Sequence, residues 1–495
     1  MPNDIDNAQV RLVEEYLEPE PAKISPGEYV RTRISTLRPP MSKVANPFTL
    51  LASLNRTQWL FFLCAFSSWT WDAFDFFTVS LTVQPLAKQF GKTNAQITWG
   101  MTLVLMLRSV GAVIFGLLSD RYGRKWPFII NNLLFVVLEL GTGFTSTYGS
   151  FLACRALFGI AMGGLYGNAA ATALEDAPSE ARGVLSGIFQ AGYAFGYLLA
   201  TAFSRGLVNT TVYGWRPLFW FGACPPVLII VFRLCLPETT AYRERAAIRN
   251  STHHATKTFL EEGRLALKNH WLMFVYMVLF MSGFSFMGHG SQDLYPTLLT
   301  NQFGFSPDAL TVTQVVANLG SITGCITAGH VSEIFGRRLT VIVYCVVGSA
   351  LIYPYTYVST TAVMASAFFL QFCIQGAFGV VPSHLTELSP GSLRTFMVGT
   401  SYQLGNLVSA ASSTIEATMG ERYPLPPTKK GVKRYNYGLV ICIFLACSVG
   451  FTLILTLIGP ERKDVSLKVL HPPEIEGHSG HKEKNVGDVG AKESV

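Results

Sequence analysis

About twelve apolar runs, each roughly twenty residues long, limit what this chain can fold into more than any other feature. Each run is long enough to cross a hydrocarbon core of about 30 Å. Only 14% of the 495 residues are charged and the mean hydropathy is +0.34, whereas soluble domains carry about 25% charged residues. The sequence therefore predicts an all-α polytopic membrane protein. We expect spans near residues 59–85, 97–118, 127–146, 150–173, 183–205, 216–236, 271–300, 309–331, 339–358, 361–384, 395–418 and 436–458.

The basic residues lie in the loops between these spans, so the net charge of +7 does not indicate a nucleic-acid partner. They cluster at residues 121–125 after the second span, at 337–338 after the eighth and in the segment 237–270. Because cytosolic loops carry the excess of lysine and arginine, we expect these loops and both termini in the cytosol. The basic loop 429–434 disagrees, since it would lie outside.

A long internal repeat divides the chain. The motif G-x-x-S-D-R-Y-G-R-K at 116–125 returns as G-x-x-S-E-I-F-G-R-R at 329–338, about 213 positions later. Glu175, Pro178 and Arg182 recur as Glu387, Pro390 and Arg394 at nearly the same displacement. A repeat of this length predicts two similar six-span units. The expected organisation is an N-terminal tail (1–58), a first half (59–236), a linker (237–270), a second half (271–458) and a C-terminal tail (459–495).

The paired loops resemble the signature of the major facilitator superfamily, a family of membrane transporters. The resemblance covers residues 59 to 462 and implies a 12-helix fold with two pseudo-symmetric six-helix halves. In that family these loops form ion-pair latches between helices. The resemblance thus implies gating roles for Asp120 with Arg124 and for Glu333 with Arg337. We find no nucleophile-elbow, phosphate-binding or metal-ligand motif, so an enzyme is not expected.

The seventh span carries a second, narrower resemblance. His289 and Asp293 lie four residues apart, hence on one face of a helix. The stretch H-G-S-Q-D-L-Y-P-T at 289–297 is similar to the signature of fungal lactate and pyruvate proton symporters of the Jen family, N-x-x-S/T-H-x-S/T-Q-D-x-x-x-T. Ser285 stands where that signature has asparagine, and Gly288 where it has serine or threonine. Both departures concern the identity of the acid carried.

A small carboxylate that enters a low-dielectric site needs a cation or several donors to replace its water. Arg108, near the middle of the second span, is the best-placed cation, and its guanidinium matches a carboxylate in a bidentate way. An internal ion pair with Asp72 or Asp75 is the alternative for Arg108. The other candidate substrate-binding residues, for which a structural role is the alternative, are Arg155, Phe189, His289, Ser291, Gln292, Gln403 and Asn406.

Proton coupling needs a group that binds a proton on one side of the membrane and releases it on the other. The pair Asp72 and Asp75 in the first span and the pair His289 and Asp293 in the seventh both qualify, and the sequence does not choose between them. Glu139 and His330 appear isolated, and we interpret them as structural.

The resemblance to the Jen family thus implies a symporter that imports small monocarboxylates such as lactate and pyruvate, and also acetate and propionate, by alternating access. The alternatives are a proton symporter for dicarboxylates or another organic acid, and a non-transporting nutrient sensor of the same fold. We expect no cofactor, with the proton gradient as the energy source. The expected setting is a monomer in the plasma membrane with its termini in the cytosol. Besides substrate, proton and lipid, the ubiquitination machinery is an expected partner of the tails.

Overall fold

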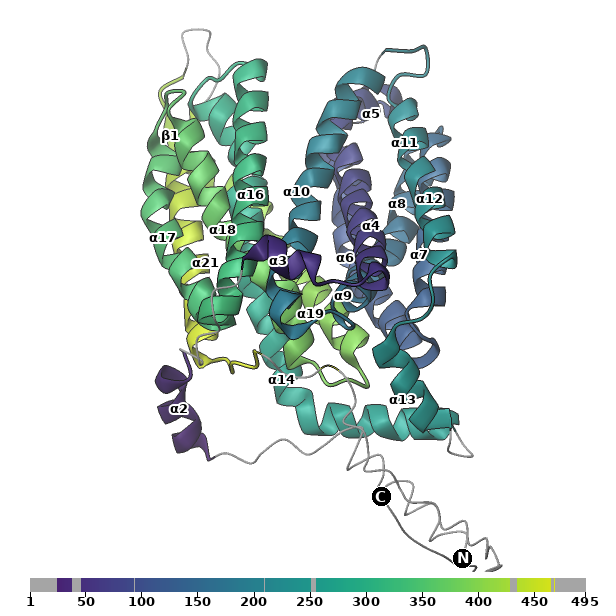
Figure 1. The fold of residues 1–495 in the computed structure, drawn as a ribbon. Coiled ribbons are helices and arrows are strands. Elements are labelled where there is room, and N and C mark those ends of the chain that lie inside the picture. Colours follow the sequence, from purple (N-terminus) through teal and green to yellow (C-terminus); the bar gives the residue numbers. More distant parts are fainter. Residues whose placement is uncertain are drawn as a thin grey trace, which may run out of the picture.

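The computed structural model describes residues 25–37, 46–92, 94–208, 210–250, 255–427, 434–463 and 467. Its helices form two bundles that stand side by side (Figure 1). The first bundle contains α4 (Arg56–Leu81), α5 (Val83–Phe90), α6 (Asn94–Tyr122), α7 (Lys125–Gly143), α8 (Tyr148–Gly163), α9 (Leu165–Leu174), the short 3-10 helix η2 (Ser179–Ala181), α10 (Arg182–Leu207), α11 (Arg216–Gly222) and α12 (Cys224–Leu234). The second contains α14 (Ala255–Gln292), α15 (Tyr295–Thr297), the π-helix η3 (Leu298–Gln302), α16 (Pro307–Phe335), α17 (Arg337–Tyr357), α18 (Val363–Leu388), α19 (Arg394–Ser409), α20 (Ser412–Gly420) and α21 (Tyr437–Ile458).

The predicted twelve-helix architecture is confirmed. Ten helices of the described residues are long and apolar enough to cross a membrane. The two remaining spans are α4, which contains two aspartates, and the pair α19 and α20, which contains amide and carboxyl side chains. Their polar residues make these two spans less apolar. A membrane span tolerates such residues here because they lie inside the protein, away from lipid.

The seventh span differs from the single run expected at 271–300. Helix α14 already begins at Ala255, so it passes from the expected linker into the bundle without a break. It ends at Gln292, and the N–H of Asp293 bonds to the carbonyl of His289 at 2.9 Å. Pro296 lies in the first turn of α15, where its missing N–H is tolerated. The chain therefore bends just after the His289–Asp293 pair.

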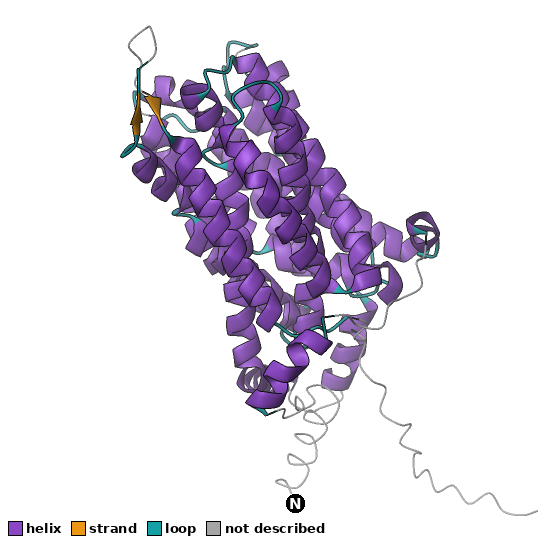
Figure 2. Ribbon diagram, turned by 90° about the vertical axis from the view of Figure 1, so that its left-hand side faces the viewer, coloured by secondary structure: helices purple, strands orange, loops and turns teal. Residues whose placement is uncertain are grey.

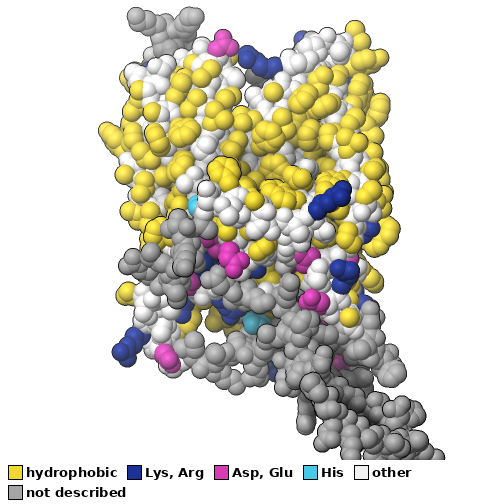
Figure 3. Space-filling model, in the orientation of Figure 1, with side chains coloured by type: hydrophobic (Ala, Val, Ile, Leu, Met, Phe, Trp, Pro, Cys, Tyr) yellow, Lys and Arg dark blue, Asp and Glu magenta, His cyan; other side chains and the backbone are white. Residues whose placement is uncertain are grey.

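The two ends of the molecule are chemically different. Figure 3 shows a broad hydrophobic surface above a lower zone in which most of the visible charged side chains gather. We call the lower end the basic end, because α13 (Thr240–Asn250) and the loops at 121–125 and 337–338 lie there. The opposite, hairpin end carries the antiparallel strands β1 (Pro424–Leu425) and β2 (Arg434–Tyr435) (Figure 2).

Two short helices lie in the described part of the expected N-terminal tail. Helix α2 (Pro26–Ser35) begins at the cap residue Ser25, and α3 (Pro47–Ala52) begins at the cap residue Asn46. The Tyr29 hydroxyl donates to the carbonyl of Ile458 at 3.0 Å, so α2 is attached to the end of α21. The tail histidines and lysines beyond residue 467, and with them the expected ubiquitination sites, lie outside the described residues.

Glycines allow helices to pack closely at two places in the bundles. A Cβ at Gly163 of α8 would lie 1.8 Å from the carbonyl oxygen of Arg108 on α6. A Cβ at Gly187 of α10 would lie 2.3 Å from the carbonyl oxygen of Cys325 on α16. The backbones touch at both places, so a side chain there would force the helices apart.

Candidate functional site

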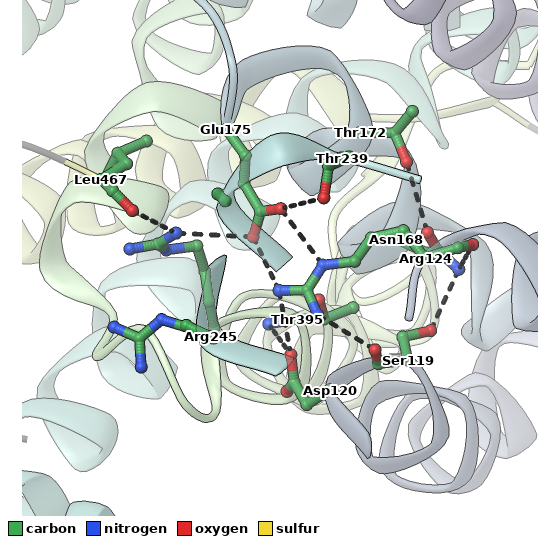
Figure 4. Close-up of polar contacts among 12 residues, drawn as sticks. Ser119, Asp120, Arg124, Asn168, Thr172, Glu175, Thr239, Arg245, Thr395 and Leu467 are labelled. Atoms are coloured by element: carbon green, nitrogen blue, oxygen red, sulfur yellow. Dashed lines mark hydrogen bonds and ion pairs between the residues drawn. The ribbon is translucent and has the colours of Figure 1, made fainter. Parts of the chain in front are cut away.

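An ion-pair network joins the two halves at the basic end (Figure 4). Asp120, in the last turn of α6, accepts hydrogen bonds from the backbone N–H groups of Thr395 (3.1 Å) and Phe396 (2.8 Å). These N–H groups belong to the first turn of α19, where no carbonyl within the helix can reach them. Arg124 lies 3.4 Å from Asp120 and 2.7 Å from Glu175. A carboxylate of the first half thus caps a helix of the second.

The second half repeats this arrangement toward the first. Glu333, near the end of α16, accepts a hydrogen bond from the N–H of Gly183 in the first turn of α10. Arg337 lies 2.7 Å from Glu333 and 2.8 Å from Glu387. Both ion pairs expected from the repeat, Asp120 with Arg124 and Glu333 with Arg337, are present, and each carboxylate also bridges the halves. Their gating role stays a prediction.

The charges of the first network support one another. Burial alone would raise the pKa of Glu175, but the guanidinium groups of Arg124 and Arg394 hold it below its ordinary value. Conversely, burial alone would lower the pKa of Arg124, and the carboxylates of Glu175 and Asp120 raise it above its ordinary value. Glu175 and Arg124 therefore stay ionised at neutral pH, as their ion pair requires.

The halves diverge toward the hairpin end (Figure 1). The salt bridge between Arg205 of α10 and Asp308 of α16 is an inter-half contact at that end, at 3.5 Å, and both side chains are mostly exposed. Exposed ion pairs of this kind contribute little free energy. The two halves are thus joined by buried hydrogen bonds and ion pairs at the basic end, whereas the exposed salt bridge at the hairpin end joins them only weakly.

Arg108 lies buried where the halves meet. Its Nη2 is 3.7 Å from a carboxylate oxygen of Asp72 and 2.6 Å from the sulfur of Met162. Its guanidinium lies 4.9 Å from the centre of the Phe76 ring. The Nε of Arg108 has no hydrogen-bond partner among the described residues. The internal ion pair that we considered as the alternative is therefore present, but it is long and leaves part of the donor fork unused.

An aromatic cluster surrounds this arginine. Trp69 of α4 packs against Tyr166 (4.9 Å between ring centres), Phe189 (5.9 Å), Tyr193 (5.5 Å) and Tyr402 (6.0 Å). Phe189, a predicted substrate-binding residue, is thus part of this wall. Tyr402 comes from the second half and stacks on Tyr166 of the first at 3.7 Å. The cluster therefore spans both halves.

Buried charges of the first half form a second group behind Asp72. Arg155, predicted as a substrate ligand, forms a 3.0 Å ion pair with Glu139, and both side chains are inaccessible to solvent. Glu139 is therefore not isolated, and our interpretation of it as a lone residue was wrong. Asp75 interacts electrostatically with Glu139, Arg155 and Asp72, yet neither of its carboxylate oxygens has a hydrogen-bond partner in the described chain.

Polar side chains of the second half face the same region. His289 Nδ1 lies 3.0 Å from Asp293 Oδ2, which makes the i,i+4 pair expected on α14. The Ser285 hydroxyl donates to Asn406 at 3.2 Å, and Asn406 donates to Gln403 at 3.1 Å. His289 also interacts with Asn406 and, across the interface, with Arg108. The structure thus brings the predicted residues of α14, α19 and α6 together.

Ser291 and Gln292 lie differently from the other predicted ligands. The Ser291 hydroxyl is buried and donates back to the carbonyl of Gly288 at 2.9 Å. Its own carbonyl accepts a hydrogen bond from Tyr355 of α17. Gln292 donates to Gln371 of α18 at 3.0 Å. Both residues therefore hold α14 against neighbouring helices of its own half, and neither lies in the group around Arg108.

Sequence reasoning missed several residues of this region. Trp69, Tyr166 and Tyr402 were not predicted as site residues, because an aromatic residue in an apolar helix gives no signal of which face it occupies. Glu416 of α20 was also missed, although a carboxylate inside an expected span is a signal that should have been used. No group of metal-ligating side chains occurs among the residues that the structure describes.

Comparison with known proteins identifies the family. The sugar (and other) transporter family matches residues 49–472. The chain belongs to this family. A carboxylic acid transporter protein homolog of Saccharomyces cerevisiae is 40% identical over 443 residues, which cover 86% of this chain and 72% of the relative. The predicted resemblance to the major facilitator superfamily and to the fungal Jen-type carboxylic acid transporters is thereby confirmed.

A more distant relative is also named a transport protein, and a solved structure has the same fold. The cis,cis-muconate transport protein of Acinetobacter baylyi is 25% identical over 357 residues, covering 72% of this chain and 86% of the relative. The structure of the proton:xylose symporter XylE superposes with a TM-score of 0.68 at 18% identity and covers 84% of this chain and 98% of its own. At that identity the likeness shows the fold alone. The matched relatives are named as transporters, which agrees with the expectation that this is not an enzyme.

Proposed function

We propose that this family member is a proton-coupled symporter that imports small monocarboxylates, such as lactate and pyruvate, by alternating access. The observation that carries the proposal is a group of buried donors without partners among the described residues: Nε of Arg108, Nε1 of Trp69 and Nε2 of Gln403. A carboxylate accepts hydrogen bonds and donates none, so it complements such a group. The 40% identical yeast relative, named a carboxylic acid transporter homolog, supports the same class of substrate.

The charge of the region favours an acid with one carboxylate. Arg155 is already paired with Glu139, so Arg108 is the arginine left to meet substrate in this part of the described chain. The aromatic wall around Trp69 suits the short apolar remainder of such a molecule. A second carboxylate would need a second cation or it would remain unpaired at high cost.

A dicarboxylate is the second candidate, and one observation favours it. His289 lies near Arg108 and is paired with Asp293. If His289 carries a proton, it supplies a second positive charge for a second carboxylate.

We assign the transported proton to Asp75. The buried group of the first half has three carboxylates, Asp72, Asp75 and Glu139, for two guanidinium groups, Arg108 and Arg155. Asp72 is in an ion pair with Arg108 and Glu139 with Arg155, whereas Asp75 has neither an ion pair nor a hydrogen-bond partner among the described residues. An unpaired charge at this depth is expensive, so a proton on Asp75 balances the group. Substrate bound to Arg108 would weaken the ion pair between Arg108 and Asp72. Substrate binding would thereby be coupled to proton binding in this group of carboxylates.

The orientation follows from the charge of the loops. We place the basic end in the cytosol and the hairpin end outside, in the plasma membrane. The structure then corresponds to an outward-facing state, in which proton and acid enter from the hairpin end. The two networks at the basic end break when the halves rock to release substrate.

Uptake into proteoliposomes tests the proposal. Labelled lactate, pyruvate and succinate are offered with and without an inward proton gradient. We expect lactate and pyruvate to accumulate only with the gradient and succinate to accumulate less. No uptake of any carboxylate would refute the substrate class, and uptake that ignores the gradient would refute the coupling. Preferred uptake of succinate would select the dicarboxylate alternative.

Two variants separate the substrate site from the proton site. Asp75→Asn should abolish accumulation driven by the gradient while exchange of labelled for unlabelled acid continues, because exchange requires no net proton movement. Asp308→Asn is the matched control, since Asp308 is exposed at the hairpin end and, among the described residues, forms a salt bridge with Arg205 alone. Loss of exchange as well in Asp75→Asn would make Asp75 a structural or substrate-binding residue.

A further inference from the structure

Glu416 is a buried carboxyl group that the site described above does not use. It lies on α20, in the eleventh span, and its side chain is inaccessible to solvent. Neither of its two carboxylate oxygens has a hydrogen-bond partner among the described residues. Among buried carboxylates it shares this condition with Asp72 and Asp75 of the first half. It therefore requires an explanation of its own.

The small residue Gly290 brings α14 close to this carboxyl group. A Cβ at Gly290 would lie 3.3 Å from Oε1 of Glu416 and 2.6 Å from the ring of Phe444 on α21. Gly290 directly follows His289 in the sequence, and Asp293 on the same helix acts electrostatically on Glu416. The carboxyl group is thus enclosed by α14 and α21, next to the His289–Asp293 pair.

No lysine or arginine occurs among the described groups that enclose Glu416, and His289 of α14 is the nearby residue that can carry a positive charge. Helix α14 presents His289 and Asp293, and α17 presents Tyr355, which interacts with Glu416. Helix α21 carries no lysine, arginine, histidine, aspartate or glutamate along its sequence, and its Tyr437 packs on Gly420 at the end of α20. His289 is bonded to Asp293. An ionised Glu416 would be a second negative charge beside Asp293, in a setting where an unpaired charge costs several kcal/mol.

Asp293 provides a connection to solvent. Its side chain is 37% exposed, whereas Glu416 is fully enclosed. Asp293 interacts electrostatically with Glu416, so it is the solvent-accessible carboxyl group with which Glu416 can exchange a proton. The exchange changes only one O–H bond: a proton leaves one carboxyl oxygen and binds the other, with no further reactant.

We propose that Glu416 is a proton-binding site of the second half. It holds a proton while α14, α20 and α21 enclose it, and its occupancy is linked to the ionisation of the His289–Asp293 pair. The inference rests on the proposed proton-coupled function and adds a second titrating site to Asp75. It gives each half one buried carboxyl group that is neutral in the outward-facing state.

Infrared spectroscopy of the purified full-length protein in lipid nanodiscs tests the protonation directly. At neutral pH the wild type should show absorption from carboxylic acid groups that are protonated and weakly hydrogen-bonded. Glu416→Gln should lose a part of this absorption, and Glu421→Gln, which changes the exposed carboxylate just after α20, should keep all of it. Glu416→Asp, which retains an acid, should keep the absorption at a shifted frequency and serves if the glutamine variant does not fold. Absorption unchanged in Glu416→Gln would overturn the proposal.

Uptake at two external pH values tests the linkage. One titrating group changes its occupancy up to about tenfold per pH unit. We expect the ratio of lactate uptake at about pH 5 to that at about pH 7 to fall about threefold or more in Glu416→Gln and to stay constant in Glu421→Gln. The same ratio in Glu416→Gln as in the wild type would overturn the linkage. If the wild type itself transports no acid, the proposed function fails, while the infrared result still decides whether Glu416 holds a proton.

Discussion

The substitution Asp120→Asn should open the basic end of the molecule. In the structure the two oxygens of Asp120 accept from the N–H groups of Thr395 and Phe396, at 3.1 and 2.8 Å, and one of them faces Arg124 at 3.4 Å. Asparagine keeps one acceptor oxygen and turns an NH₂ group toward the other N–H. One of the two bonds across the interface is then lost and replaced by a contact between two donors.

The magnitude follows from the kind of bond that is lost. A hydrogen bond to a charged group contributes about 1.5 to 3 kcal/mol. A loss of about 2 kcal/mol corresponds to roughly a 30-fold shift of the equilibrium between the closed and the open basic end. Glu333→Gln should give a similar shift, because Glu333 caps α10 in the same way.

Hydrogen–deuterium exchange with mass spectrometry, on protein in nanodiscs, measures this shift. Peptides that cover the start of α19 should exchange about ten to thirty times faster in Asp120→Asn than in the wild type. Asp308→Asn is the control, because that pair also joins the halves but is exposed at the hairpin end. If exchange at the start of α19 changes less than about threefold, or changes equally in the control, the reasoning about these buried bonds is wrong.

Three further predictions concern binding, pH and packing. Arg108→Lys should raise the KM for lactate uptake about tenfold or more, because an ammonium cannot present the donor fork; an unchanged KM would make Arg108 structural. The pKa of Glu175 is held below its ordinary value by Arg124 and Arg394, so its contribution to stability is complete above about pH 5 and is lost progressively below that pH. The melting temperature of the wild type should therefore fall from about pH 5 to pH 3 more steeply than that of Glu175→Gln, and parallel curves would contradict this. Gly163→Ala should lower the yield of folded protein and its melting temperature, because the new Cβ would lie 1.8 Å from the carbonyl oxygen of Arg108. Gly149→Ala is the control and should change neither, because a Cβ at Gly149 has no atom within 4 Å. Equal melting temperatures for the two alanine variants would refute the packing argument.

Hydrophobic length and the internal repeat were enough to predict the twelve spans and the two halves. The repeat also identified the carboxylate–arginine pairs at the basic end, because Asp120 with Arg124 and Glu333 with Arg337 are local i,i+4 pairs on one stretch of chain. It did not reveal that each carboxylate caps a helix of the opposite half. That contact joins residues about 275 positions apart for Asp120, and no local pattern records it.

The candidate site was predicted in part. Arg108, His289, Asn406 and Gln403 were found as polar residues in apolar spans, and the structure brings them together. Ser291 and Gln292 belong to the same motif but face other helices of their own half, because residues on a helix point in successive directions about 100° apart and only some face the centre. Glu139 seemed isolated because its partner Arg155 lies on the next span.

By itself the sequence determined which segments cross the membrane, since that depends on the apolar length of each segment, and it determined that two equivalent halves exist. Only the tertiary structure decided which ionisable groups are paired, because pairing depends on which helix faces meet. It assigns Arg155 to Glu139 and Arg108 to Asp72, and it leaves Asp75 and Glu416 without partners among the described residues. A charge in a low-dielectric interior is tolerated only with a partner or a proton, so these two carboxyl groups become candidates for proton binding through packing alone.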